Sequence, residues 1–115
     1  MDGISSDVIR GYNDTMILCI LSVRPSYGYE ISKEIARRTG EKYRIKETTL
    51  YSAFTRLLKN GLVDSYPQVG PENGKKRTYY RITEKGRAYY RDRCREWELT
   101  KEVVEGFIEK GARYH

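Results

Sequence analysis

The stretch from Lys46 to Val63, KETTLYSAFTRLLKNGLV, predicts one short helix that stops sharply and is followed at once by a strand. At about 100° per residue, one side of this helix is apolar and carries Leu50, Ala53, Phe54, Leu57 and Leu58. The opposite side carries short hydroxyls and cations, with no carboxylate after Glu47: Thr48, Ser52, Thr55, Arg56 and Lys59. Asn60-Gly61 ends the helix, because glycine readily adopts the left-handed conformation of a C-cap.

The polar face of this helix has two interpretations. It could be an ordinary solvated face that happens to lack acids. Alternatively, short hydroxyl side chains let a helix approach another surface closely, and arginine and lysine there can meet phosphates or guanine edges. The segments that follow favour the second interpretation.

Residues 62–69 and 77–82 read as two strands joined by the turn cluster Gly70-Pro71-Glu72-Asn73-Gly74. Lys75, Lys76 and Arg77 follow that turn, so the hairpin has a basic tip. Val63, Tyr80 and Ile82 are candidate inward positions, and Tyr79 and Arg81 point the other way. A polar-faced helix followed by a basic hairpin is typical of a winged helix-turn-helix.

The rest of the chain supplies supporting helices. Residues 8–24 form an apolar first helix that ends at Pro25, and residues 27–39 form a second helix with Ser26 as its expected N-cap. The predicted organisation is a flexible N-terminus (1–7), a winged helix-turn-helix domain (8–82; recognition helix about 47–60, wing about 62–82), a C-terminal helix (83–110) and a flexible tail (111–115). The fold class is mainly α with a small β-hairpin wing.

The last predicted helix is capped by Thr83 and has more apolar surface than its own small domain can cover. Its stripe steps by four and three residues through Tyr90, Cys94, Trp97, Lys101, Val104 and Ile108, and Val103 and Phe107 widen it. An exposed apolar stripe of this kind needs a partner. The simplest partner is a second copy of the chain, which would give a C2 homodimer.

Four segments in register resemble the PadR family of bacterial transcriptional regulators: SYGYEI (26–31), TLYSAFTRL (49–57), NGLV (60–63) and RTYYRITEKG (77–86). The resemblance covers roughly residues 9–108. Ser52-Ala53 departs from it, since many members have Pro-Ala or Pro-Val there. The resemblance implies a homodimeric repressor that binds a promoter, with a contact from Tyr51 to DNA and dimerisation through the last helix.

The expected partner is therefore double-stranded DNA with a pseudo-palindromic operator. Thr48, Thr49, Ser52 and Arg56 are expected to read or flank bases, with Thr55 on the same face. Tyr51, Lys59, Lys75, Lys76 and Arg77 are expected to hold phosphates. An alternative is a winged-helix module that binds another protein, but such a surface would carry apolar anchors that this helix face lacks.

Trp97 is the candidate ligand residue. Two copies of a tryptophan in the middle of a helix can face each other across a dimer axis and sandwich a small planar hydrophobic molecule, as in some small relatives within the family that it resembles. Alternatively, Trp97 only fills the dimer core and binds nothing.

Charge and composition exclude other classes. The net charge of +6 suits a polyanionic partner. No enzyme, metal site or cofactor is expected, because the one histidine is His115 and the sequence lacks a Cys/His cluster, a nucleophile–base pair and a glycine-rich phosphate loop. The longest apolar run, from Met16 to Val23, is far shorter than the ~20 residues of a membrane span, so a cytoplasmic protein is expected.

Overall fold

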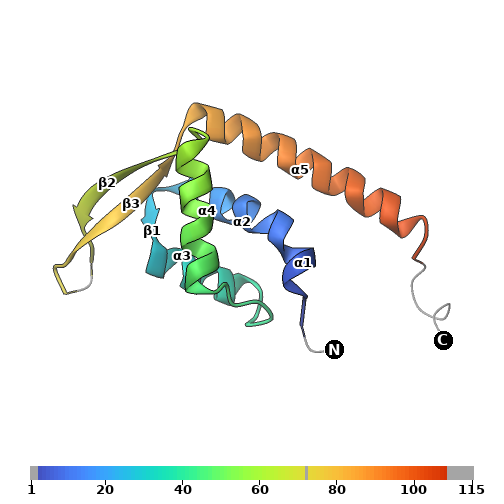
Figure 1. The fold of residues 1–115 in the computed structure, drawn as a ribbon, viewed down its shortest axis with the longest axis horizontal. Helices are drawn as coiled ribbons and strands as arrows, with labels where there is room; N and C mark the ends of the chain where they lie inside the picture. Colours follow the sequence, from blue (N-terminus) through green and yellow to red (C-terminus); the bar gives the residue numbers. More distant parts are fainter. Residues whose placement is uncertain (1–2, 72, 109–115) are drawn as a thin grey trace.

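The computed structural model describes residues 3–71 and 73–108 and shows a small helical domain with a three-stranded antiparallel sheet. The elements are α1 (Ser6–Ile9), η1 (Arg10–Tyr12), α2 (Asn13–Val23), β1 (Ser26–Tyr27), α3 (Gly28–Arg38), α4 (Glu47–Lys59), β2 (Val63–Val69), β3 (Lys76–Ile82) and α5 (Glu84–Glu105). The hairpin projects at one end of the molecule and α5 extends toward the other (Figure 1), which gives extents of 54 × 30 × 21 Å.

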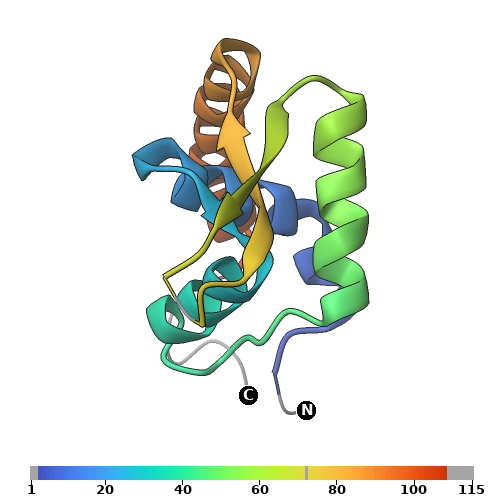
Figure 2. The ribbon, with the colours of Figure 1, turned by 90° about the vertical axis from the view of Figure 1, so that its left-hand side faces the viewer.

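The core lies where α2, α3 and α4 meet the inner face of the sheet. Ile17 and Leu18 on α2, Ile31 on α3 and Leu57 on α4 are completely buried. Phe54 on α4 stacks on Tyr80 of β3 with ring centroids 3.9 Å apart, which joins the predicted recognition helix to the sheet. Figure 2 shows α4 standing beside the hairpin and α3 lying below it.

The N-terminal helix differs from the prediction of one helix over residues 8–24 preceded by a flexible segment. Helix formation begins earlier, because the Ser5 side chain caps α1 by accepting from the Val8 amide, and a 3₁₀ turn then separates α1 from α2. The break occurs at Gly11, a residue with low helix propensity. The Gly11 carbonyl accepts from the Arg93 guanidinium on α5 at 3.0 Å, so the break also anchors α5.

The short strand β1 was not expected. Ser26 was predicted to cap the second helix, but Ser26 and Tyr27 are extended and pair with Tyr80 and Tyr79 of β3. The Ser26 hydroxyl donates to the Glu30 carboxylate instead of capping the helix. β1 makes β3 the central strand, so both edges of β3 are paired, one with β1 and the other with β2. Tyr79, which was predicted to point outward, does face away from Tyr80 but is buried against Tyr27, with ring centroids 5.1 Å apart.

The hairpin follows the predicted turn chemistry. Asn73 and Gly74 both have positive φ, near 58° and 59°, a conformation that Asn-Gly adopts at little cost. The Gly70 amide donates to the Lys75 carbonyl at 2.9 Å and closes the turn. The strands then pair in register from Val69 with Lys76 to Val63 with Ile82.

Thr83 caps α5 as predicted: its hydroxyl accepts from the Gly86 amide at 3.0 Å and donates to the Gly61 carbonyl at 2.8 Å. The helix ends at Glu105 rather than near Lys110, which lies outside the described residues. Gly106 forms the C-cap, so Phe107 and Ile108 lie in a turn beyond the helix. Within residues 3–71 and 73–108, no helix is long and apolar enough to cross a membrane.

Candidate nucleic-acid interface

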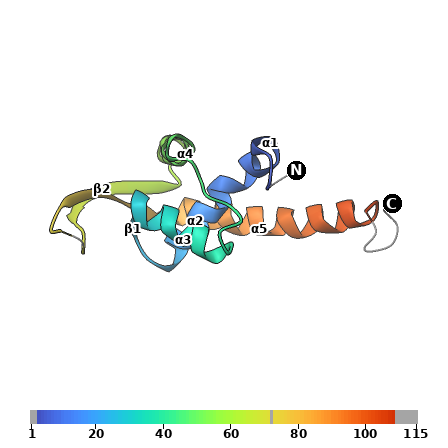
Figure 3. The same ribbon diagram turned by 90° about the horizontal axis from the view of Figure 1, so that it is seen from below.

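The outer face of α4 is polar and exposed along its length. Its apolar face buries Leu50, Ala53, Phe54 and Leu57, whereas Leu58, which was also expected on that side, is 39% exposed. Thr48, Ser52, Thr55, Arg56 and Lys59 are all exposed, and Thr49 is half-buried at the edge. The Thr55 hydroxyl donates to the Tyr51 carbonyl at 3.0 Å and so lies close to the helix backbone. Because the four hydroxyl residues have short side chains, another surface can approach the backbone of α4 closely. Figure 3 shows α4 end-on at one edge of the molecule.

Tyr51 lies on the flank of α4 that faces α3 and the wing. Its ring packs edge-on against Phe54, with centroids 5.4 Å apart. Its hydroxyl points at the start of α3, since a Cβ on Gly28 would lie 2.6 Å from that oxygen. Only glycine leaves room for the hydroxyl at this position. The Tyr51 hydroxyl thus occupies the space that a side chain at residue 28 would need.

The start of α3, the start of α4 and the wing enclose a polar hollow of about 720 Å³. Tyr51 lines it from α4, Ser32 from α3, and Lys76 and Thr78 from β3. These groups come from three segments that are far apart in the sequence. The fold therefore brings hydroxyls, the cations of Lys76 and Arg77 and the carboxylate of Glu47 to one concave surface.

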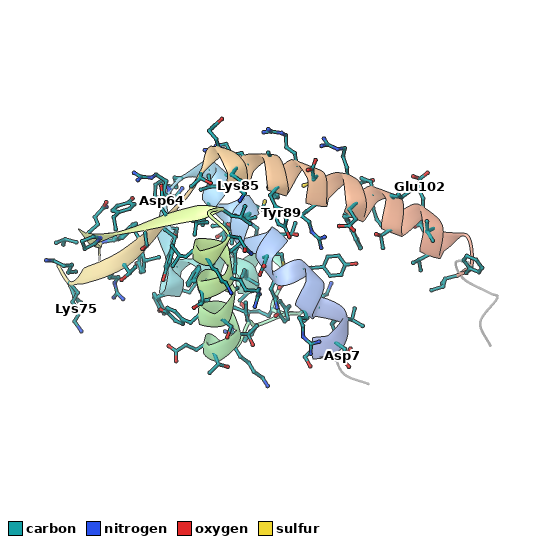
Figure 4. The ribbon with its side chains drawn as sticks, turned by 45° about the horizontal axis from the view of Figure 1, so that its top comes forward. Asp7, Asp64, Lys75, Lys85, Tyr89 and Glu102 are labelled. Carbon is teal, nitrogen blue, oxygen red and sulfur yellow. The ribbon has the colours of Figure 1, made fainter. Side chains whose placement is uncertain are left out.

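The three basic residues of the wing differ in their exposure and contacts. Lys75 and Lys76 are exposed, and Figure 4 shows Lys75 extending from the tip of the hairpin. Arg77 instead folds back onto the sheet, with its guanidinium carbon 4.9 Å from the centroid of the Tyr27 ring. Its Nε is buried and has no hydrogen-bond partner within the described part of the chain. Arg77 was expected to hold a phosphate; the structure places it over Tyr27 and on the lining of the same polar hollow as Lys76.

Arg56 lies on the other flank of α4, facing α2. Its Nη2 donates to Oδ1 of Asp14 at 2.7 Å and its Nε to Oδ2 at 3.3 Å. The hydrogen bond with Asp14 raises the pKa of Arg56. Arg56 was expected to read or flank bases, and this ion pair was not foreseen.

A second, more apolar groove of about 950 Å³ runs between the N-terminal segment and α5. Tyr90, Cys94 and Trp97 line it from α5, and Tyr12 lines it from η1. The Tyr12 and Trp97 rings meet edge-on with centroids 5.2 Å apart, so Tyr12 packs within its own chain. Interactions with Cys19 and Cys94, together with burial, raise the pKa of the Tyr90 hydroxyl.

The C-terminal part of α5 extends away from the rest of the domain (Figure 1). Lys101 is half-buried over the Trp97 ring, with its ammonium 5.7 Å from the ring centroid. Val103, Val104, Phe107 and Ile108 are exposed, and Phe107 is 86% exposed. The predicted stripe thus divides into a half covered by α2 and η1 and a half that is open.

Sequence reasoning missed three contributors to this interface. Asp14 was missed because its partner is 42 residues away in sequence and no local pattern signals it. Tyr27 was predicted to begin a helix, so its place in β1 and its contact with Arg77 were not foreseen. Gly28 was expected only to allow close packing of helices, whereas its neighbour is the Tyr51 hydroxyl.

Metal chemistry finds no support in the described residues: nowhere in 3–71 and 73–108 do three or more His, Cys, Asp or Glu side chains gather as a metal site would need. The groups around the polar hollow are hydroxyls, the Lys76 amine and the Arg77 guanidinium, so its two cations outnumber its one carboxylate, Glu47. This set suits an anionic surface.

Comparison with known proteins identifies what kind of protein carries this surface. Residues 17–92 match the Transcriptional regulator PadR-like family. The structure is similar to that of a transcriptional regulator from Clostridium thermocellum, with 60% identity, a TM-score of 0.83 and coverage of 92% of this chain and 99% of the other. It is also similar to a PadR family transcription regulator from Clostridium difficile, with 34% identity, a TM-score of 0.74 and coverage of 84% and 98%.

In sequence, the chain is 43% identical over 106 residues to an uncharacterized protein of Lysinibacillus sphaericus, covering 92% of this chain and 96% of that protein. The family match spans most of the winged helix-turn-helix and the first part of α5, and the structural matches extend over nearly the whole chain. This chain belongs to the PadR-like family of transcriptional regulators.

Proposed function

We propose that this DNA-binding regulator is a homodimeric repressor that binds a pseudo-palindromic operator. Each protomer would lay α4 in a major groove, with successive half-sites about 34–36 Å apart. The family consists of transcriptional regulators and not of enzymes, which sets the class of function. The observation that carries the finer proposal is the exposed face of α4, with its short hydroxyls, Arg56 and Lys59.

Base reading is assigned to Thr48, Thr49, Ser52, Thr55 and Arg56. Short hydroxyls allow the backbone of α4 to come close to the base edges, and arginine can bind guanine through two parallel N–H groups. Phosphate contacts are assigned to Tyr51, Lys59, Lys75 and Lys76. The polar hollow that Tyr51 and Lys76 share supports a phosphate strand passing between α4 and the wing.

Arg77 remains a candidate for the phosphate set only if it leaves Tyr27 when DNA binds. Its present contact favours a different role, in which it holds the base of the wing at a fixed angle to the sheet. Lys75 and Lys76 then carry the charge of the wing toward the backbone.

Dimerisation is assigned to α5 and the turn after it. The open half of α5 carries exposed Val103 and Val104, and the exposed Phe107 follows them. Apolar side chains in a row at the end of a small domain lose unfavourable contact with water when a second copy covers them. Tyr90, Cys94, Trp97 and Lys101 continue this surface toward the groove.

A small planar hydrophobic ligand is the second candidate partner, and the groove beside Trp97 favours it. Trp97 is 43% exposed and lies at the side of a largely apolar groove. Such a ligand would regulate DNA binding only if it bound one arrangement of the two protomers more tightly than another. If Trp97 instead packs tightly against its copy in the dimer, the groove has no ligand role.

The test is a selection from random-sequence duplexes, followed by fluorescence anisotropy on the selected duplex and on a scrambled one across a salt series. We expect tighter binding to the selected duplex by about 10³-fold or more, with affinity falling steeply as salt rises. Sedimentation of the complex should give two chains per duplex. Failure to enrich any sequence, or equal affinity for both duplexes, would remove the specific-regulator proposal.

A further inference from the structure

The Asp14–Arg56 pair is unusual in this structure because it joins two helices that are distant in sequence. The other ion pairs within residues 3–71 and 73–108 either join residues three or four apart or cross between β2 and β3. Asp14 is at the start of α2, and Arg56 is near the end of α4. This pair therefore fixes a side chain of α4 from outside the helix.

The geometry uses only one edge of the guanidinium. Asp14 takes the Nε–H and one Nη2–H of Arg56. An arginine side chain has five N–H donors in a planar fork. Three N–H groups are left, and two of them, the second Nη2–H and one Nη1–H, form a two-donor edge of the kind that binds O6 and N7 of guanine.

Exposure of the two side chains fits this division. The Asp14 side chain is 22% exposed, whereas the Arg56 side chain remains 48% exposed. The carboxylate is thus the inner member of the pair and the guanidinium the outer one. If Asp14 were covering Arg56 to withhold it from DNA, the guanidinium would be expected on the covered side.

We propose that Asp14 is a positioning residue for sequence reading: it orients Arg56 so that the free Nη1/Nη2 edge faces the major groove. This inference rests on the proposed function of α4 as the recognition helix. A long arginine side chain carries about 2 kcal/mol of rotamer entropy, and a fixed guanidinium loses less of it on meeting a base. Asp14 acts through Arg56 and does not itself touch DNA.

The test uses the full-length protein and the duplex selected by the wild type, with each base pair of the half-site changed in turn. Arg56→Ala identifies the position that Arg56 reads, since discrimination there should disappear. Asp14→Asn should reduce discrimination at that same position by up to about 30-fold, the ratio that corresponds to the ~2 kcal/mol of rotamer entropy. Discrimination at the other positions should stay within about twofold.

Asp92→Asn is the matched control, because it removes the same charge from an exposed helix position where the carboxylate pairs with Arg95 on the same helix. Both substitutions raise affinity for all DNA slightly by removing a negative charge, so the ratio between duplexes is the informative quantity. In an Arg56→Ala background, Asp14→Asn should cause no further change in the ratio. A purely structural role would lower the melting temperature of both backgrounds and leave the ratio unchanged.

Several results would overturn the inference while leaving the proposed function in place. One such result is that Asp14→Asn leaves unchanged the ratio of affinities for the selected duplex and for the duplex altered at the base pair that Arg56 reads. Another is that this ratio rises, which would mean that Asp14 competes with DNA for Arg56. If Asp14→Asn does not fold, Asp14→Glu provides the measurement: it keeps the charge but lengthens the side chain, and we expect the same loss at the same position. Failure of the wild type to select any sequence would overturn both proposals.

Discussion

Gly86 lies where the first turn of α5 crosses the start of β2, and replacing it with alanine gives the most direct test of this packing. A Cβ built on Gly86 lies 2.0 Å from the Leu62 carbonyl oxygen and 2.8 Å from a side-chain carbon of Ile82. Carbon and carbonyl oxygen normally approach to about 3.3 Å. Because the nearest atom belongs to the backbone, the clash cannot be relieved by a change of rotamer.

The expected loss in the free energy of unfolding can be estimated from the contacts that the added methyl group would strain. α5 has to retreat by about 1 Å, which strains the hydrogen bond from the Thr83 amide to the Leu62 carbonyl (3.1 Å) and the one from the Thr83 hydroxyl to the Gly61 carbonyl (2.8 Å). Overpacking costs typically ~1–3 kcal/mol and each weakened hydrogen bond about 1 kcal/mol, whereas alanine recovers roughly 1 kcal/mol of helix propensity. We expect Gly86→Ala to lower the free energy of unfolding by about 3 kcal/mol.

The assay is thermal and urea unfolding followed by circular dichroism, with all proteins at one concentration because the proposed dimerisation would make stability depend on concentration. A loss of this size should lower Tm by roughly 10–15 °C in a domain of this length. Gly11→Ala is the matched control, since a Cβ there meets nothing within 4 Å and the backbone φ is not positive. A Gly86→Ala protein as stable as the Gly11→Ala protein would refute the close approach of α5 to β2.

Three further predictions concern the wing, the dimer and a surface ion pair. Replacing Lys75 and Lys76 with alanine should reduce the slope of log affinity against log salt by about one unit for each lost phosphate contact, and an unchanged slope would exclude the wing from the DNA footprint. Phe107→Asp should give monomers in sedimentation and abolish operator binding, because it places a charge on the proposed apolar interface; a surviving dimer would exclude this surface. Hydrogen bonds from Arg37 and Arg38 lower the pKa of Glu34 from its ordinary value of about 4.5 to about 2. The ionised Glu34 carboxylate therefore stabilises the fold fully above pH 4.5, and this contribution is lost as the pH falls toward 2. The difference in Tm between wild type and Glu34→Gln should accordingly shrink below pH 4.5, and a difference that does not vary with pH would contradict the ion pair.

Local patterns in the sequence were enough to predict α4, the turn of the hairpin and the start of α5. The periodicity of residues 46–60 predicted α4 because its apolar and polar residues separate cleanly at helical spacing. Asn73-Gly74 predicted the hairpin turn because few residue pairs adopt positive φ at both positions. Thr83 predicted the start of α5 because a threonine before a helical pattern can accept an amide hydrogen bond. Each of these signals lies within a few residues of the structure that it specifies.

Contacts between distant segments were decided only by the tertiary structure. β1 has two residues, too few for an alternating pattern, and it exists because β3 offers a free edge to Ser26 and Tyr27. That strand in turn draws Arg77 onto Tyr27 and away from the wing tip. Fold class and the polar face of α4 are thus properties of local sequence. The partners of Arg56 and Arg77 depend on which segments meet in space, and side chains this long can reach several alternative partners that the sequence does not rank.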